Sequence, residues 1–154
     1  MKKGFTFIEL LLYVAIVGTI FSSLVPFAWN VIEGGARSSV DQEVDSNARF
    51  IMEKIKSKTR NAKNISVAMT SLTITEQDLS TTTIDLSGGN IRLNAVNLNS
   101  ADTTVTDLVF TDFSSGSTTK QVQVRFTLTS AVAQARQEYR QTVTLESSAE
   151  VRAI

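Results

Sequence analysis

One carboxylate in this chain lies where an ionised side chain is unfavourable. Glu9 is the only charged residue in positions 5–32, which otherwise hold apolar, small and uncharged polar residues. A charged side chain at the centre of a membrane-spanning helix costs about 2.5–3.5 kcal/mol on insertion scales, and less towards the helix end. Such a carboxylate either binds a partner of opposite charge or reaches the lipid headgroups. Glu9 is therefore the first candidate functional residue.

The other chemically capable side chains offer weaker sites. The chain has no Cys and no His, which removes disulfides, thiolate nucleophiles, imidazole bases and the usual zinc sites. Catalysis would then need paired carboxylates, or Ser and Lys, and Asp107 and Asp112 are the available carboxylate pair. No spacing brings them into one pocket, so we expect no catalytic residue and no enzyme activity.

Oxygen ligands for calcium occur in two polar groups, but neither follows a diagnostic pattern. No EF-hand spacing is present, and a solvated surface explains the acidic helix residues better than a metal site does. We therefore expect no metal and no cofactor. The first group is Asp41, Glu43 and Asp45; the second is Asp85, Asn90 and Asp102.

Nucleic acid is an unlikely partner. The formal net charge is zero, and the one basic cluster lies at the expected end of a helix, where positive charge complements the helix dipole. Aromatic residues that could stack on bases are missing from that cluster. Its members are Lys54, Lys56, Lys58, Arg60 and Lys63.

The apolar stretch around Glu9 has the length of a membrane span. Residues 10–29 carry no charge, and twenty residues at a rise of ~1.5 Å cover ~30 Å, the thickness of the hydrocarbon core. Lys2 and Lys3 precede the stretch, and the positive-inside rule keeps them in the cytoplasm. The sequence predicts a single-pass membrane protein with a cytoplasmic N-terminus.

A removed secretory signal peptide is the alternative interpretation. The basic start fits it, but the apolar stretch is too long and contains a carboxylate. The best cleavage site of that kind follows Ala28 and has Pro26 where a small residue is needed. A retained helix is the better prediction.

Residues 5–64 are expected to form one long helix with two characters. Positions 5–32 are apolar all round, as suits lipid, and positions 33–64 are amphipathic. Gly18 and Pro26 are predicted bends in a continuous helix, whereas Gly34 and Gly35 leave open whether a second helix begins there. The apolar face is expected at Ile32, Ala36, Val40, Val44, Ala48, Ile51, Ile55 and Ala62, spaced close to the helical period. Two acid-to-base pairs at i,i+4 support the polar face, Glu33 with Arg37 and Asp45 with Arg49.

Residues 65–154 change to a Ser-, Thr- and Val-rich texture typical of strands. Residues 122–128 are apolar at every second position, and with residues 107–113 and the Ser/Gly turn at 114–117 they predict a hairpin. A final strand is expected within 139–151. We predict an α+β fold in which the long helix packs on one antiparallel sheet. The predicted strands are 65–69, 72–75, 83–86, 90–93, 107–110, 122–128 and 142–145.

The N-terminus resembles the signal sequence of type IV pilins and pseudopilins. In that family a short basic leader ends in Gly, an apolar residue such as Phe follows, and a Glu stands at the fifth mature position. Gly4, Phe5 and Glu9 match these positions, and Gly18 and Pro26 fall where many members carry Gly and Pro. The motif covers about the first 30 residues, and the rest shares only the expected pilin-like architecture.

The resemblance implies a processing step and an assembly role. A prepilin peptidase would cut after Gly4, removing leader residues 1–4, and would methylate the new N-terminal Phe5. The new ammonium of one subunit would then pair with Glu9 of a neighbour, which sets the axial register of the filament. Implied partners are other pilin or pseudopilin subunits, the peptidase, an inner-membrane assembly platform and the lipid bilayer. The mature chain would leave the inner membrane for a cell-surface or periplasmic filament.

Two features of the sequence bear on whether the chain resembles a major or a minor subunit. The absence of Cys excludes the C-terminal disulfide loop of many major pilins, and the long Ser/Thr-rich region resembles minor, priming subunits. A membrane-anchored binding module or enzyme that never polymerises is the alternative, and it would need neither Glu9 nor the Gly4-Phe5 junction.

Overall fold

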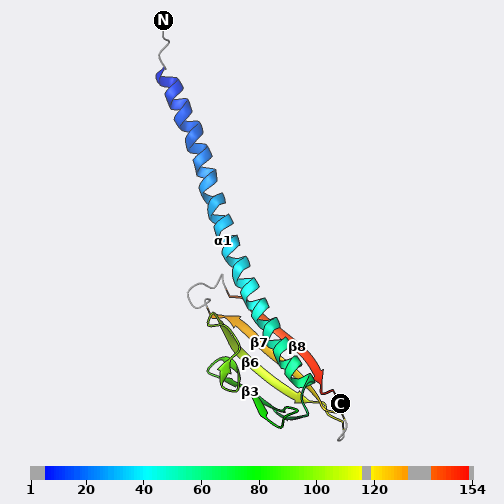
Figure 1. The fold of residues 1–154 in the computed structure, drawn as a ribbon. Helices are drawn as coiled ribbons and strands as arrows, with labels where there is room; N and C mark the ends of the chain where they lie inside the picture. The colour runs from blue at the N-terminus through cyan, green and yellow to red at the C-terminus, as the bar shows by residue number, and fades with distance from the viewer. Residues whose placement is uncertain (1–5, 116–118, 132–139, 153–154) are drawn as a thin grey trace. The chain divides into compact units, whose positions relative to one another are not determined.

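The computed structural model describes residues 6–115, 119–131 and 140–152. The chain divides into two compact units, Met1–Ser39 and Val40–Ile154. Helix α1 (Phe7–Arg60) belongs to both units, and the elements described after it are strands (Figure 1). The protein therefore has an α+β fold with one long N-terminal helix and antiparallel sheets.

Helix α1 is continuous through the residues that were expected to weaken it. Pro26 lies inside the helix, and Gly34 and Gly35 do not end it, so the two-helix alternative is wrong. The helix ends at Arg60 rather than at about residue 64, because the chain turns there and β1 (Asn64–Ala68) begins.

The buried face of α1 begins later than its sequence pattern suggests. Ile32 and Ala36 are exposed, whereas Val44, Ala48, Ile51 and Ile55 are fully buried. The first two lie in the N-terminal unit and do not belong to the apolar cluster formed by the described residues. The last four share one apolar cluster with strand residues that include Phe126, Leu72 and Ile84.

The strands form two sheets where one was predicted. Strands β1, β2 (Ser71–Thr75), β3 (Thr81–Ser87), β4 (Asn90–Leu93) and β5 (Val96–Asn97) pair in chain order as one antiparallel sheet. Strands β6 (Thr103–Asp112), β7 (Gln121–Ser130) and β8 (Thr142–Glu150) form a second antiparallel sheet. The expected hairpin is confirmed as β6–β7, with Leu108 opposite Phe126.

The two sheets join through loop-to-edge hydrogen bonds, which explains why one continuous sheet does not form. The β1–β2 turn supplies the Met69 carbonyl to the Phe110 N–H at 2.9 Å, and the β3–β4 turn supplies the Gly89 carbonyl to the Val105 N–H at 2.8 Å. The free edge of β6 is thus met by turns instead of a strand. A register shift between Val105 and Asp107 accompanies this junction.

Gly89 has two reasons to be a glycine. Its φ is +75°, a backbone conformation that residues other than Gly, Asn and Asp rarely adopt. A Cβ at this position would also lie 2.8 Å from the Thr104 Cγ2 atom. Gly88 and Gly89, both with positive φ, make the two-residue turn whose twist suits a tight hairpin.

Strand β8 extends well past its predicted end. It runs from Thr142 to Glu150 and pairs with β7 along its whole length. Only Ala149 in it is buried, so its sequence shows little alternation beyond Leu145. Tyr139, the first residue of the segment expected to supply the final strand, lies outside the described residues.

Candidate functional site

The first turn of α1 forms a reciprocal cap around Glu9. The Thr6 hydroxyl oxygen accepts the Glu9 backbone N–H at 3.4 Å, and the Glu9 Oε2 atom accepts the Thr6 backbone N–H at 3.4 Å. This Thr-x-x-Glu arrangement is a capping box, which satisfies two N–H groups that a helix start leaves unpaired. The acid also lies where the positive end of the helix dipole favours it.

The cap leaves Glu9 able to bind a cation. Both capping hydrogen bonds are long, and only one carboxylate oxygen takes part. Among the described residues Glu9 has no ion-pair partner. The predicted processing residues, Gly4 and Phe5, lie outside the described part of the chain. A carboxylate in the first helical turn can therefore serve both as a local cap and as a counter-ion for an ammonium from another chain.

The helix that carries Glu9 is long and apolar enough to cross a membrane. Its best 18-residue window has a mean hydropathy of 2.1, lies near the N-terminus and is not buried by any other part of the chain. Large apolar side chains such as Phe7, Phe21 and Phe27 are between 61% and 77% exposed. An unbroken apolar surface of this kind needs lipid or other apolar helices around it.

The few polar side chains in the apolar stretch are satisfied within the helix. The Thr19 hydroxyl donates to the Ala15 carbonyl at 2.8 Å, and the Ser23 hydroxyl donates to the Ile20 carbonyl at 2.9 Å. Trp29 marks the far end, where its indole N–H donates to the Glu33 carboxylate at 3.0 Å. Tryptophan at such a boundary is typical of a membrane–water interface.

Gly18 and Pro26, the two predicted bends, both lie inside this helix. A Cβ at Gly18 would meet no described atom within 4 Å, so close packing among the described residues does not require a glycine there. Pro26 has no backbone N–H and so cannot bond the Ser22 carbonyl in the usual helical pattern. The helix nevertheless continues through both residues.

The two carboxylates considered for catalysis have different partners and lie apart on one strand. Asp107 lies 3.8 Å from the Arg125 guanidinium, whereas the Asp112 Oδ1 atom accepts the Ser114 N–H at 2.8 Å. Hydrogen bonds from the Ser114 side chain and backbone hold the pKa of Asp112 below its usual value. Five residues of one strand separate the two acids, roughly 17 Å, and place them on opposite faces. They do not form a catalytic pair.

Two of the residues considered as calcium ligands, Asp85 and Asn90, have side-chain partners within the protein. Asp85 accepts two hydrogen bonds from the Arg92 guanidinium, one of them at 3.0 Å. The Asn90 side-chain oxygen accepts from the Asn99 amide at 2.9 Å. Within the described ranges, no three acidic side chains come close enough to hold a metal ion.

The acidic residues of the helix, 41–45, are exposed. Asp45 lies 3.9 Å from Arg49, as the i,i+4 spacing predicted. The Glu43 Oε1 atom accepts the Asn47 amide at 2.7 Å, and the Asn47 side-chain oxygen accepts the Ser100 N–H at 2.9 Å. This second acid therefore helps to tie the helix to the loop that follows β5.

The basic end of α1 is divided between paired and unpaired cations. The Lys58 ammonium donates to the Glu76 carboxylate at 2.7 Å, and Lys56 pairs with Glu53 at 3.0 Å. Arg60 forms no ion pair with any described residue. It lines an open hollow of about 570 Å³ at the end of the helix.

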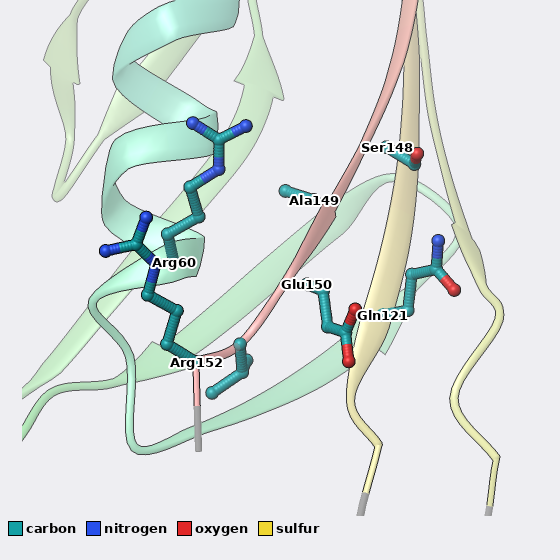
Figure 2. A pocket seen from close by; sticks show the side chains of 7 residues that line it. Arg60, Gln121, Ser148, Ala149, Glu150 and Arg152 are labelled. Atoms are coloured by element: carbon teal, nitrogen blue, oxygen red, sulfur yellow. The ribbon is translucent and has the colours of Figure 1, made fainter. Parts of the chain in front are cut away.

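The hollow is lined by the last residue of α1, by residues of β7 and β8, and by the segment that follows β8 (Figure 2). The Arg152 backbone N–H donates to the Arg60 carbonyl at 3.2 Å, which holds the two arginines side by side. Nearby hydrogen-bonding groups belong to Gln121, Ser148 and Glu150. The full lining is Arg60, Gln121, Ser148, Ala149, Glu150, Val151 and Arg152.

Sequence reasoning missed the capping box and the hollow for different reasons. The spacing Thr6-x-x-Glu9 is visible in the sequence and is a known signal for a helix start. Arg60 and Arg152 are far apart in the chain, and only the return of β8 to the end of α1 brings them together. Comparison with protein-family models, with curated proteins and with solved structures found no match for this chain.

Proposed function

We propose that this protein is a subunit of a type IV pilus or a related secretion pseudopilus, anchored in the membrane and polymerised through α1. One observation carries the proposal. Glu9 lies in the first turn of a helix whose apolar surface is exposed, directly after the Gly4-Phe5 junction that resembles a prepilin cleavage site. A plain membrane anchor needs neither that carboxylate nor that junction.

Processing would create the charge that Glu9 is placed to bind. Cleavage after Gly4 removes Lys2 and Lys3 and leaves an ammonium on Phe5, next to the capping residue Thr6. An ammonium at the start of a helix faces the positive end of the helix dipole. In lipid it has little water to compensate, so a carboxylate from a neighbouring subunit is its natural partner.

The pair would determine alignment more than binding strength. A buried ion pair gains little net free energy after desolvation, but breaking one leaves an uncompensated charge. Misaligned neighbours would leave both charges unpaired, much as a buried polar residue fixes the register of a coiled coil. The exposed apolar side chains of α1 would supply most of the packing between subunits.

In this proposal the globular unit faces the extracytoplasmic side, and copies of the subunit assemble with one another. Its partners are other pilin or pseudopilin subunits, the prepilin peptidase and an inner-membrane assembly platform. The chain would begin in the inner membrane with its N-terminus in the cytoplasm. After assembly it would reside in a cell-surface or periplasmic filament.

A set of three variants separates the intermolecular role of Glu9 from its local cap. Glu9→Gln keeps a capping-box side chain but removes the charge, and Glu9→Val removes both. Thr6→Ala removes the capping hydroxyl and keeps the charge, at a cost of about 1 kcal/mol to the helix start. We expect both Glu9 variants to be inserted and processed but to be missing from sheared filaments, whereas Thr6→Ala assembles.

The mature N-terminus gives a second, independent test. Mass spectrometry of the protein from its native host should find a chain that begins at methylated Phe5. An intact Met1, or Glu9→Val at wild-type level in sheared filaments, contradicts the proposal and favours a tethered module that does not polymerise.

A further inference from the structure

The hollow at the end of α1 presents two positive charges that have no counter-ion among the described residues. Arg60 and Arg152 are both exposed, are held together by the 3.2 Å backbone hydrogen bond, and form no ion pair with any described residue. Among the described residues that line the hollow, Glu150 is the only acid, and its carboxylate points away from both guanidinium groups, towards Gln121 (Figure 2). Two like charges at one hollow repel each other, so an anion bound there would be favoured by both.

The chemistry of the hollow favours a carboxylate. Guanidinium groups bind carboxylates through two parallel N–H donors, with good geometry and more strongly than a neutral donor would. The C-terminal dipole of α1 explains a cation at Arg60, but it does not account for Arg152, which comes from the segment after β8. The second arginine is the observation that points to a ligand.

An exposed acidic turn on the same globular unit is complementary to this hollow. Asp41, Glu43 and Asp45 place three carboxylates within five residues, and all three side chains are exposed. Within the described part of the chain, the one ion pair that this turn makes is the distant contact of Asp45 with Arg49, at 3.9 Å. The turn therefore has negative charge in excess, as the hollow has positive charge in excess.

The turn and the hollow of one chain cannot meet. Seventeen residues of continuous helix separate Glu43 from Arg60, which corresponds to roughly 25 Å along the axis. A second copy displaced along the helix direction by that distance would bring its acidic turn to the hollow. A regular filament repeats such a displacement between every pair of equivalent neighbours.

We propose that the Arg60–Arg152 hollow of one copy receives the acidic turn, residues 41–45, of another copy in the assembled filament. This inference rests on the proposed function, since it requires copies that assemble. It assigns the globular unit an electrostatic contact of its own, separate from the contact of Glu9 in the N-terminal unit. Such contacts contribute specificity between partners more than raw affinity.

Cysteine cross-linking tests the contact directly, because the chain has no native Cys. Asp45→Cys and Arg152→Cys chains are expressed together in the native host, so that a heterodimer forms only between different chains. We expect oxidation of sheared filaments to give a heterodimer band. The matched control replaces Arg152→Cys by Thr142→Cys, at the exposed opposite end of β8, and should give at least tenfold less heterodimer.

Charge reversal gives a readout that does not depend on cysteine geometry. The double variant Arg60→Glu and Arg152→Glu should lower the yield of sheared filaments by about tenfold or more. Adding Asp41→Arg and Asp45→Arg should restore much of that yield. Glu43 is left unchanged because its carboxylate bonds Asn47, which holds the loop at Ser100.

The outcomes separate this inference from the proposed function. Filaments that carry both cysteines without a heterodimer above the Thr142→Cys control, and a charge-reversed chain that assembles normally, would overturn the contact and leave the pilin proposal intact. A chain that keeps Met1 and forms no filament would overturn both.

Discussion

At the residue scale, the charge of Glu76 couples the fold to pH. Its Oε1 atom accepts hydrogen bonds from the Lys58 ammonium and from the Thr82 hydroxyl, both at 2.7 Å. These bonds, with that from Lys58 the larger influence, hold the pKa of Glu76 below its ordinary value of 4.5. The pair joins the end of α1 to the loop between β2 and β3.

The direction of this pKa shift fixes the direction of the pH dependence. Between the lowered pKa and 4.5, the unfolded chain binds more protons at Glu76 than the folded chain does, so stability rises with pH in that range. The contribution is complete above pH 4.5 and is lost as the pH falls through the folded-state pKa.

We therefore predict that Glu76→Gln is less stable than the wild type at pH 7, and that the difference narrows below pH 4.5. Thermal unfolding of the full chain in detergent micelles, followed from pH 7 to pH 3, measures this. Lys58→Met removes the largest cause of the pKa shift of Glu76. In that background, the difference in stability between chains with and without Glu76→Gln should be smaller over the same pH range. Parallel stability curves for wild type and Glu76→Gln would contradict the prediction.

At the scale of elements, α1 has one apolar pattern but two environments. Ile55 is fully buried in the core of the globular unit, whereas Ile32, another residue of the predicted apolar face, is 67% exposed. Truncating a buried Ile removes its packing and leaves a cavity, which typically costs about 2–5 kcal/mol. An exposed Ile has little packing to lose within the monomer.

These two residues make a matched pair of substitutions. Ile55→Ala should lower the free energy of unfolding of the globular unit by about 2–5 kcal/mol, and Ile32→Ala should change it by less than about 0.5 kcal/mol. Urea unfolding of the full chain in micelles, followed by the loss of β-sheet circular dichroism, gives both values. Equal losses in the two variants would show that Ile32 belongs to the core.

How far the sequence predicts each element depends on what the element buries. Strand β7 buries alternate side chains such as Val124 and Phe126, so its period of two is plain in the sequence. Strand β8 has one exposed face and one that is mostly half-buried, and its end, Ser147–Glu150, places only a serine and an alanine on the half-buried face, so no apolar alternation marks it in the sequence. The two-residue β5 is too short for any pattern.

The division into two sheets also has no local signal. It depends on the carbonyls of Met69 and Gly89 bonding the edge of β6, and these contacts join segments that are distant in the sequence. Binary patterning predicts which residues face a core, but not which strand edges meet. The candidate site divides in the same way, since Glu9 is evident from its neighbours in sequence and the Arg60–Arg152 hollow is not.

At the scale of the whole molecule, the two units differ in what they need from their surroundings. The globular unit buries its own apolar cluster, while the window of highest hydropathy in α1 is not buried at all. At about 20 cal/mol or more per Å² of apolar surface, exposure of this stretch to water is strongly unfavourable. The bilayer, and later the neighbouring helices of a filament, would provide the apolar surroundings that this chain does not supply for itself.

The apolar stretch of α1 predicts that the full chain is retained in the membrane. The protein should stay in the membrane fraction through an alkaline carbonate wash and be released by detergent. Ile20→Arg places a charge near the middle of the apolar stretch, at a cost of about 2.5–3.5 kcal/mol for insertion, so it should reduce the retained fraction sharply. Ser39→Arg adds the same charge beyond the stretch and should be retained like the wild type. Release of the wild type by carbonate alone would show that α1 lies on the membrane surface or outside it. That result would contradict the filament proposal, which requires a chain anchored in the membrane before assembly.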